Sequence, residues 1–328
     1  MPSRMNELPV FADVLEARQR LQGHAVVTPV IDSPKLNALT GGRVFIKAEC
    51  LQRTGSFKFR GAWNCISRLG GHEAGVVAYS SGNHAQGVAA AAQMMGLPAL
   101  IVMPADTPEI KKFNTRSYGA EIVTYDRATE SREEIAQRIC DQRGAVLVPP
   151  FEHKHIMAGQ GTLALELVEQ VSERGAALDC VLTPCSGGGL TAGIALALEG
   201  SSKETDLYAV EPAGFDDYGR SLRSGKRERN SSSSGSICDA LLTAQPGEMT
   251  FAINQPRLAG AFAVDEAEVK RAIIFAFENL KLVIEPGGCV ALAAVLAARI
   301  ETQGKTIGII ASGGNVDAGL YASILAGR

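Results

Sequence analysis

The sequence has no pair of cysteines in C-x-x-C spacing, and its seven cysteines are odd in number and widely scattered. Such a set argues against both a disulfide framework and a structural zinc site. No apolar run reaches membrane-spanning length, and the first seven residues lack the apolar core of a signal peptide. We therefore expect a protein of the reducing cytoplasm that has no contact with a membrane.

The sequence also lacks an excess of charge of one sign. Its 32 basic residues stand against 35 acidic ones, and no helix or tail concentrates Lys or Arg. Nucleic acid is therefore not an expected partner. At 328 residues and 46% hydrophobic content, the chain can bury a large core in one domain or in two.

Short apolar runs alternate with amphipathic stretches of helical length along most of the chain. This alternation predicts βαβ units and mostly parallel sheets. A break at Pro149-Pro150 separates two series of such units, and the first occupies roughly residues 71–151. The polar segment from Arg223 to Ser236 is expected to be an exposed loop. The expected strands are Arg43–Glu49, Val76–Tyr79, Ala99–Met103, Glu121–Tyr125, Val146–Val148, Cys180–Pro184, Leu207–Val210 and Thr306–Ala311.

Three glycine-containing turns follow expected strands and open expected helices: Ser80–His84, Cys185–Leu190 and Ser312–Asn315. Because ligands of open α/β sheets bind at the carboxyl ends of strands, all three turns should face one crevice. The Gly187-Gly188-Gly189 triplet is the best phosphate cradle, although a tight structural turn explains it equally well. Neither a dinucleotide fingerprint nor a Walker loop is present.

The segment from Thr54 to Gly61 has Lys58 between two phenylalanines, and Ser56 is the expected N-cap of the helix that follows. A helix N-terminus and burial both disfavour the ammonium form of a lysine, and a Schiff base requires the neutral amine. Taken alone, Lys58 beside Arg60 at a helix start is more simply interpreted as part of a solvated face. The Ser80–His84 turn suits a substrate carboxylate, with a plain N-cap cluster as the alternative, and a structural role is the first choice for His84.

Taken in order, the lysine segment and the three turns resemble the pyridoxal-phosphate enzymes of the threonine dehydratase and serine racemase family. Met157–Thr162, Glu211-Pro212 and Glu285–Gly288 agree with it, and the resemblance extends from about Thr28 to Asp317. It implies the tryptophan synthase β-like fold, in which two open, mostly parallel twisted sheets carry helices on both faces. Pyridoxal phosphate would lie in the cleft between a large domain, residues 1–70 and 152–328, and an inserted, mobile small domain, residues 71–151.

The resemblance also implies roles for single residues around the cofactor. Lys58 would be the Schiff-base lysine and the base that removes the α-proton, and Phe57 would pack near the ring. Asn83 would bond the 3-hydroxyl of the cofactor, and Ser312 would meet the pyridine nitrogen. The phosphate loop would be Ser186, Gly187, Gly188, Gly189 and Leu190.

The implied substrate is a β-hydroxy amino acid, with its carboxylate held by Ser80, Ser81, Asn83 and His84. Ser81 matches a serine that exchanges the α-proton on the face opposite the lysine in racemase-like relatives, so racemisation stays open beside a simple carboxylate contact. Arg132 matches a position that approaches the ligand when the small domain closes in racemase-like relatives, although an exposed helical arginine is the simpler interpretation.

A divalent-cation site is implied by the segment from Glu211 to Asp217. Glu211 and Asp217 would be carboxylate ligands, and the Phe215 carbonyl would complete the protein part. Oxygen ligands of this kind suit Mg²⁺ or Ca²⁺. Without the resemblance, an acidic loop would be the simpler interpretation.

The leading hypothesis is a pyridoxal-phosphate-dependent dehydratase, or ammonia-lyase, that converts a β-hydroxy amino acid to a 2-oxo acid and ammonia. The substrate would be threonine or serine, 3-hydroxyaspartate, or a bulkier 3-hydroxy amino acid. A serine or aspartate racemase is the alternative among enzymes, and a non-catalytic phosphate-ligand binding protein is the alternative from another class. A homodimer is usual in the family.

Overall fold

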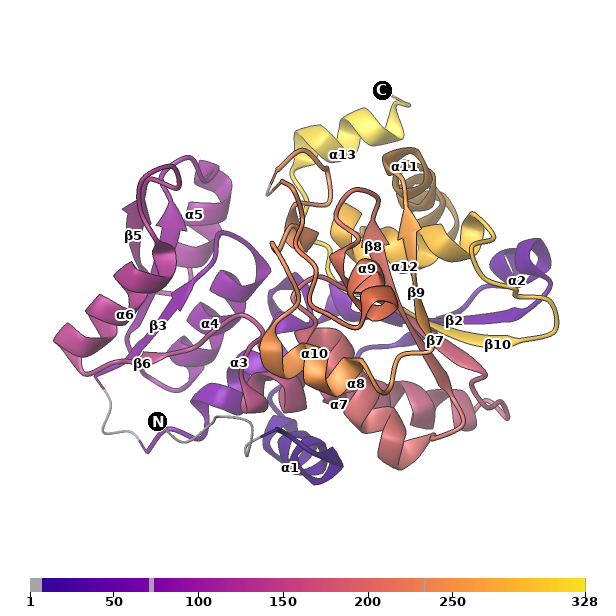
Figure 1. Cartoon of the computed structure of the whole chain (residues 1–328), viewed down its shortest axis with the longest axis horizontal. Helices are drawn as coiled ribbons and strands as arrows, with labels where there is room; N and C mark the ends of the chain where they lie inside the picture. Colours follow the sequence, from indigo (N-terminus) through magenta and orange to yellow (C-terminus); the bar gives the residue numbers. More distant parts are fainter. Residues whose placement is uncertain (1–7, 71–73, 233, 328) are drawn as a thin grey trace.

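The computed structural model describes residues 8–70, 74–232 and 234–327 (Figure 1). The first seven residues, which bear on the expected absence of a signal peptide, and residues 71–73, at a predicted domain boundary, lie outside this part. Two bodies, each built on its own sheet, lie side by side in Figure 1. In the described part of the chain, no helix is both long enough and apolar enough to span a membrane.

The larger sheet has six strands in the order β1-β2-β10-β7-β8-β9. Only β1 runs antiparallel to its neighbour, and every other pair is parallel. The smaller sheet has four parallel strands in the order β5-β4-β3-β6. The strands are β1 (Val30–Asp32), β2 (Arg43–Ala48), β3 (Val76–Tyr79), β4 (Ala99–Pro104), β5 (Glu121–Tyr125), β6 (Val146–Leu147), β7 (Cys180–Pro184), β8 (Asp206–Pro212), β9 (Gly260–Val264) and β10 (Thr306–Ala311).

Helices cover both faces of each sheet. Successive strand residues point to opposite sides, and because apolar residues lie on both sides, both faces must be buried. On β7, Val181 packs toward α7 and α8, whereas Leu182 packs toward α11 and α12. On β3, Val76 faces α4 and Val77 faces α6. The predicted fold class is thereby confirmed. The helices are α1 (Phe11–Leu21), α2 (Pro34–Thr40), α3 (Lys58–Ile66), α4 (Asn83–Met94), α5 (Glu109–Arg116), α6 (Arg132–Arg143), α7 (Lys154–Ser172), α8 (Gly189–Ser201), α9 (Asp217–Ser224), α10 (Glu248–Asn254), α11 (Glu266–Phe275), α12 (Pro286–Leu296) and α13 (Ala318–Leu325).

Helix α3 lies between the two bodies and is anchored by a buried arginine. The side chain of Arg60 is fully buried, and its guanidinium donates two 2.8 Å hydrogen bonds to Glu49 and bonds of 2.7 and 2.8 Å to Glu166 on α7. Lys47 on β2 also donates to Glu166, at 2.6 Å. Although burial raises the pKa of Glu49, the charges of Arg60 and Lys47 outweigh it and hold that pKa below its usual value. This cluster ties α3 to both β2 and α7.

Replacing Arg60 by methionine should lower the free energy of unfolding by about 3–5 kcal/mol, because the buried Glu49 would lose the guanidinium that bonds both of its oxygens. The midpoint of urea unfolding measures this loss. Arg18→Met is the matched control, since Arg18 pairs with Glu169 on the same helix α7 but is about half exposed. That change should cost at most about 1 kcal/mol. Equal losses in the two variants would contradict the role given to the buried cluster.

Candidate active site

The segment before Lys58 is fixed by backbone pairing with the turn after β10. Ser56 forms an isolated antiparallel bridge with Gly313, and Phe57 N–H donates to Ser312 O at 3.1 Å. Helix α3 therefore begins at Lys58, with Phe57 at the N-cap and no capping side chain. The predicted N-cap role of Ser56 is wrong, because the bridge holds this residue extended and its buried hydroxyl meets no partner among the described residues.

The amine of Lys58 has no carboxylate in hydrogen-bond contact within the described part of the chain. Its Nζ donates to Pro150 O at 2.8 Å and lies 5.2 Å from the centre of the Phe57 ring. Burial lowers the pKa of Lys58 to about 8, against a smaller opposing effect of the charge of Glu285. A substantial fraction of this amine is therefore neutral near physiological pH, as a nucleophile or a base must be.

The glycine triplet follows β7 and is packed so tightly that side chains are excluded. A Cβ on Gly187 or Gly189 would lie 2.6 or 2.7 Å from atoms of Phe151, and one on Gly188 would lie 2.2 Å from Tyr218 Oη. Gly188 also has φ of +90°, which favours glycine. Since Phe151 follows Pro150, the acceptor of the Lys58 amine, the triplet lies next to the lysine.

Carbonyl groups of the glycine turn accept hydrogen bonds from α10, a helix to which no sequence motif had pointed. Gly187 O accepts from Thr250 Oγ1 at 2.6 Å, and Gly188 O accepts from Asn254 Nδ2 at 3.1 Å. The N–H groups of residues 186–188 make no hydrogen bond within the described part of the chain, and Leu190 is buried in the first turn of α8. Free N–H groups at a helix start fit a phosphate.

The Ser80–His84 turn joins β3 to α4. Burial, followed by the charge of Lys58, lowers the pKa of His84 to about 3, so this imidazole is neutral. Its Nε2 is 2.8 Å from Val148 O and must carry the proton, which leaves Nδ1 as a buried acceptor without a partner among the described residues. Ser80 Oγ accepts from Gly82 N–H at 3.2 Å, whereas the Ser81 hydroxyl bonds to none of the described residues.

Two asparagines connect this turn to the turn after β10. Asn83 Oδ1 accepts from Asn315 Nδ2 at 2.7 Å, and Asn315 Nδ2 also donates to Thr54 O at 2.7 Å. Asn83 Nδ2 donates to Glu285 Oε1 at 2.6 Å. Burial, and then the charge of Asp239, raises the pKa of Glu285 to about 8. In the sequence, Glu285 stood out only as part of the Glu285–Gly288 landmark, although an acidic residue at the start of an apolar helix was a signal for a role of its own.

Ser312 and Arg132 differ in how they relate to this cluster. Ser312 is 5% exposed at the end of β10, and its hydroxyl bonds to none of the described residues, so it is free to meet a ring nitrogen. Arg132 starts α6, where its guanidinium lies 5.2 Å from the centre of the Tyr79 ring and donates to Glu133 at 2.8 Å. Among the described residues, Arg132 makes no hydrogen bond or ion pair with another predicted site residue.

The predicted cation ligands lie between β8 and α9. Both oxygens of Glu211 accept backbone N–H groups of α9 at 2.9 Å, and Asp217 Oδ1 accepts from Asn230 at 2.6 Å. Asp217 Oδ2 is buried without a partner among the described residues, and Phe215 is also buried. Burial and mutual repulsion raise the pKa of Glu211 well above its usual value, and burial raises that of Asp217 to about 6. These oxygens fit a hard divalent cation.

Asn230 lies in the segment expected to be an exposed loop, yet it is buried. The side-chain amide of Asn230 donates a hydrogen bond to Asp217, which keeps this residue in the interior, so the expectation is wrong here. No group of three or more His, Cys, Asp or Glu side chains in the described part is arranged to hold a metal, although the predicted site needs only two of them.

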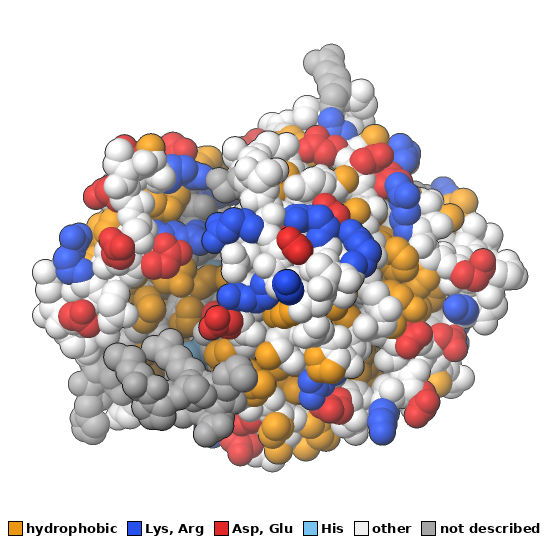
Figure 2. Space-filling model, viewed as in Figure 1, with side chains coloured by type: hydrophobic (Ala, Val, Ile, Leu, Met, Phe, Trp, Pro, Cys, Tyr) orange, Lys and Arg blue, Asp and Glu red, His pale blue; other side chains and the backbone are white. Residues whose placement is uncertain are grey.

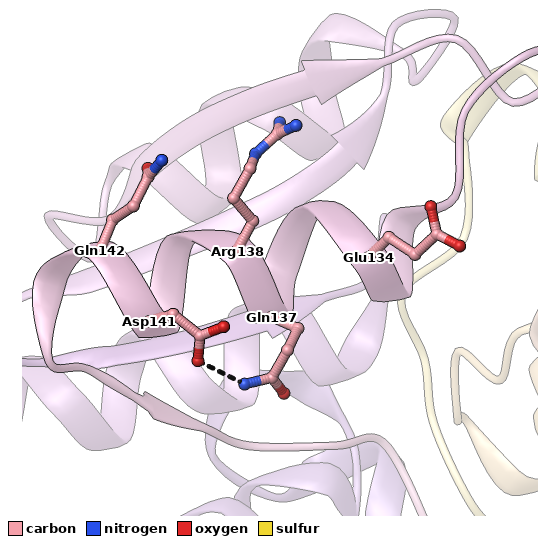
Figure 3. Close-up of a pocket in the computed structure, with 5 residues that line it drawn as sticks. All are labelled: Glu134, Gln137, Arg138, Asp141 and Gln142. Carbon is pink, nitrogen blue, oxygen red and sulfur yellow. Dashed lines mark hydrogen bonds between the residues drawn. The ribbon is translucent and has the colours of Figure 1, made fainter.

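A separate hollow lies on the outer face of α6, lined by residues of this single helix (Figure 3). Gln137 and Asp141 hydrogen-bond to each other there at 2.9 Å. The hollow contains none of the predicted site residues, and it offers no nucleophile or glycine turn. The lining residues are Glu134, Gln137, Arg138, Asp141 and Gln142.

Comparison with known proteins gives one consistent picture. The family model described as "Pyridoxal-phosphate dependent enzyme" matches residues 21–313. L-threo-3-hydroxyaspartate ammonia-lyase from Pseudomonas sp. is 44% identical over 98% of this chain and 100% of its own length. Among solved structures, maize serine racemase has a TM-score of 0.91, 38% identity and 98% coverage of both chains. Threonine deaminase from T.th. has a TM-score of 0.88 and 42% identity, covering 94% of this chain and 99% of that one.

Addition of Mg²⁺ or Ca²⁺ should raise the thermal unfolding midpoint by about 2–5 °C, because the cation would relieve the repulsion between Glu211 and Asp217. Folded-state pKa values of both acids are raised, so without a cation the stability falls as pH rises above the usual carboxyl range. The stabilisation should consequently be larger at pH 8 than at pH 5. Thermal scans with and without chelator measure it.

Asp217→Asn should abolish this response to the cation. Asp206→Asn is the control, since Asp206 lies at the exposed start of the same strand β8. An equal response in the Asp217→Asn variant would contradict the assignment of the site.

Proposed function

This chain belongs to the pyridoxal-phosphate dependent enzyme family, as its sequence motifs predicted, and we propose that it is an ammonia-lyase acting on a β-hydroxy amino acid. The observation that carries the proposal is the Lys58 amine, which burial brings to a pKa of about 8 beside a glycine cradle. A lysine with an unperturbed amine would be almost fully charged at neutral pH, and only a very small fraction would be in the neutral form that attaches a cofactor or accepts a proton.

Contacts of the lysine segment support the cofactor roles proposed from the sequence, since the Phe57 ring lies beside the amine and Phe57 N–H donates to Ser312 O. Ser186, Gly187, Gly188, Gly189 and Leu190 would hold the phosphate at the N-terminus of α8. Asn83 would bond the 3-hydroxyl, Ser312 the pyridine nitrogen, and Phe57 would pack beside the ring. When bound, pyridoxal phosphate supplies covalent attachment of the amino acid and an electron sink for the carbanion.

The chain's own residues would position the substrate and move its proton. Ser80 and Ser81 would hold the α-carboxylate with their hydroxyls, and Asn83 and His84 would hold it with their backbone N–H groups at the start of α4, with Arg132 approaching when the bodies close. Neutral Lys58 Nζ would take the proton from Cα, while the Cβ–O bond breaks and hydroxide leaves with a proton. The resulting enamine adds water and releases ammonia, which leaves the 2-oxo acid.

The arrangement of the two sheets favours a mobile small domain. Residues 71–151 would form this domain, and residues 1–70 and 152–328 would form the large one. Figure 2 shows the surface hollowed between the two bodies. We further propose a homodimer in the cytoplasm, and Mg²⁺ or Ca²⁺ at Glu211, Phe215 and Asp217.

Lys58→Ala should remove the visible absorbance band of the covalently attached cofactor and lower oxo-acid release by about 10²- to 10⁴-fold or more, because both the anchor and the base are lost. Absorbance spectra and a coupled ammonia assay measure the two effects. Lys35→Ala is a control for loss of a lysine elsewhere, since Lys35 bonds to Asn279 at the surface. Wild-type protein that stays colourless after cofactor addition would refute the proposal.

Racemisation is a second candidate activity, favoured by the Ser81 hydroxyl. This hydroxyl makes no hydrogen bond to any described residue, so it would be able to exchange a proton with Cα. If Ser81 lies across the substrate from Lys58, Ser81→Ala should abolish formation of the D-isomer while oxo-acid release from the L-substrate persists. Chiral chromatography of the amino-acid pool measures this. Absence of any D-isomer with wild-type enzyme would rule racemisation out.

A further inference from the structure

One ion pair crosses between the two bodies beside the candidate site. Lys111 on α5 belongs to the smaller body, and its Nζ lies 2.6 Å from Asp239 Oδ2 on the short helix η4 (Asp239–Leu241) of the larger body. The side chain of Lys111 is 25% exposed and that of Asp239 is 58% exposed. Lys111 is therefore held partly buried at the edge of the junction.

A chain of contacts leads from this pair to the residues proposed to hold the substrate. Ala240 follows Asp239 and packs so closely on Gly287 that a Cβ there would lie 3.2 Å from Ala240 Cβ. Gly287 is two residues beyond Glu285, which accepts the 2.6 Å bond from Asn83. The ion pair thus borders the site on the side of α12.

The effects of Asp239 and Lys111 on the pKa of Glu285 agree with a position of the ion pair beside the site. The pKa of Glu285 is raised to about 8 by burial and by the charge of Asp239, and the positive charges of Lys111 and Lys58 oppose the rise. Both lysines therefore act on the same carboxyl. Since Glu285 is mostly protonated at neutral pH, it offers little repulsion to a further anionic group nearby.

We propose that Lys111 is the specificity-determining residue that recognises a second, distal carboxylate of the substrate, so that the enzyme selects a dicarboxylic β-hydroxy amino acid. This inference rests on the proposed function, because it concerns the substrate of that same site. A substrate carboxylate takes the place of Asp239, whose exposed side chain then becomes hydrated. Monocarboxylic substrates leave the Lys111–Asp239 pair intact and gain nothing from it.

Other cations near the site are less suited to this role. Lys58 serves the cofactor and the α-proton, and Arg132 is held by Glu133 and the Tyr79 ring. Basic side chains also gather in Figure 2 on the face of the larger body, over α9 and the segment after it. Such a surface draws anionic substrates inward but does not discriminate among them.

The test compares L-threo-3-hydroxyaspartate with L-serine, measured as kcat/KM for oxo-acid release by the cofactor-loaded enzyme. Lys111→Met should lower the ratio of the two values by about 10- to 100-fold, the range expected for a lost charge-assisted hydrogen bond, mainly through KM for the dicarboxylate. Lys111→Arg keeps the charge and should retain most of the preference. Arg116→Met, which removes a charge from the exposed end of α5, should leave the ratio unchanged.

Calorimetry gives a readout that does not depend on turnover. Succinate has the four-carbon skeleton of the dicarboxylic substrate, and butyrate lacks its second carboxylate. Wild-type enzyme should bind succinate more tightly than butyrate, and Lys111→Met should remove that difference.

The outcomes separate this inference from the proposed function. Equal changes in kcat/KM for both amino acids, or an unchanged preference for succinate in Lys111→Met, would overturn the role of Lys111. Failure of the wild type to release oxo acid from any β-hydroxy amino acid would instead overturn the lyase proposal, and the succinate comparison would still test Lys111.

Discussion

The candidate site depends on the buried hydrogen-bonded ion pairs that Arg60 forms with Glu49 and Glu166. Arg60 lies two residues beyond Lys58, so the forces that fix one side chain fix the start of the helix that carries the other. Removing a cation from such a cluster leaves charges that the interior cannot solvate. By contrast, Lys58 has no carboxylate in direct contact within the described part of the chain, and its amine is pushed toward neutrality. One turn of helix thus holds a fully compensated charge and a reactive one.

The order of motifs along the chain, and the βαβ alternation, were sufficient to predict the family, the two sheets and the position of the three turns that we propose for the site. The two edge strands of the larger sheet were missed. Strand β1 has three residues, and β9 reads Gly-Ala-Phe-Ala-Val, whose side chains are mostly small. Ser56 was misassigned because its pairing with Gly313 spans most of the chain.

Glu285 and Asn230 show a different limit of the sequence. Glu285 meets Asn83 across 202 residues, and only the assembled fold shows that its carboxyl is buried. Asn230 stands before a run of serines, so local composition indicated solvent, whereas its amide is required by a buried aspartate 13 residues earlier. A polar residue's burial depends on which partners the fold brings to it, and no local pattern encodes those partners.

The hydrogen bonds that Asn83 already makes limit the number of side-chain donors left for a cofactor hydroxyl. Its carbonyl accepts from Asn315, one amide hydrogen goes to Glu285, and only one donor remains for a cofactor hydroxyl. Burial disfavours ionisation of both Glu285 and Lys58, so little fixed charge remains around that donor. Asp239 and Lys111 form their ion pair in a more exposed setting. Charge is therefore placed at the rim, where it can select a substrate, while the interior stays close to neutral and suits proton transfer between neutral groups.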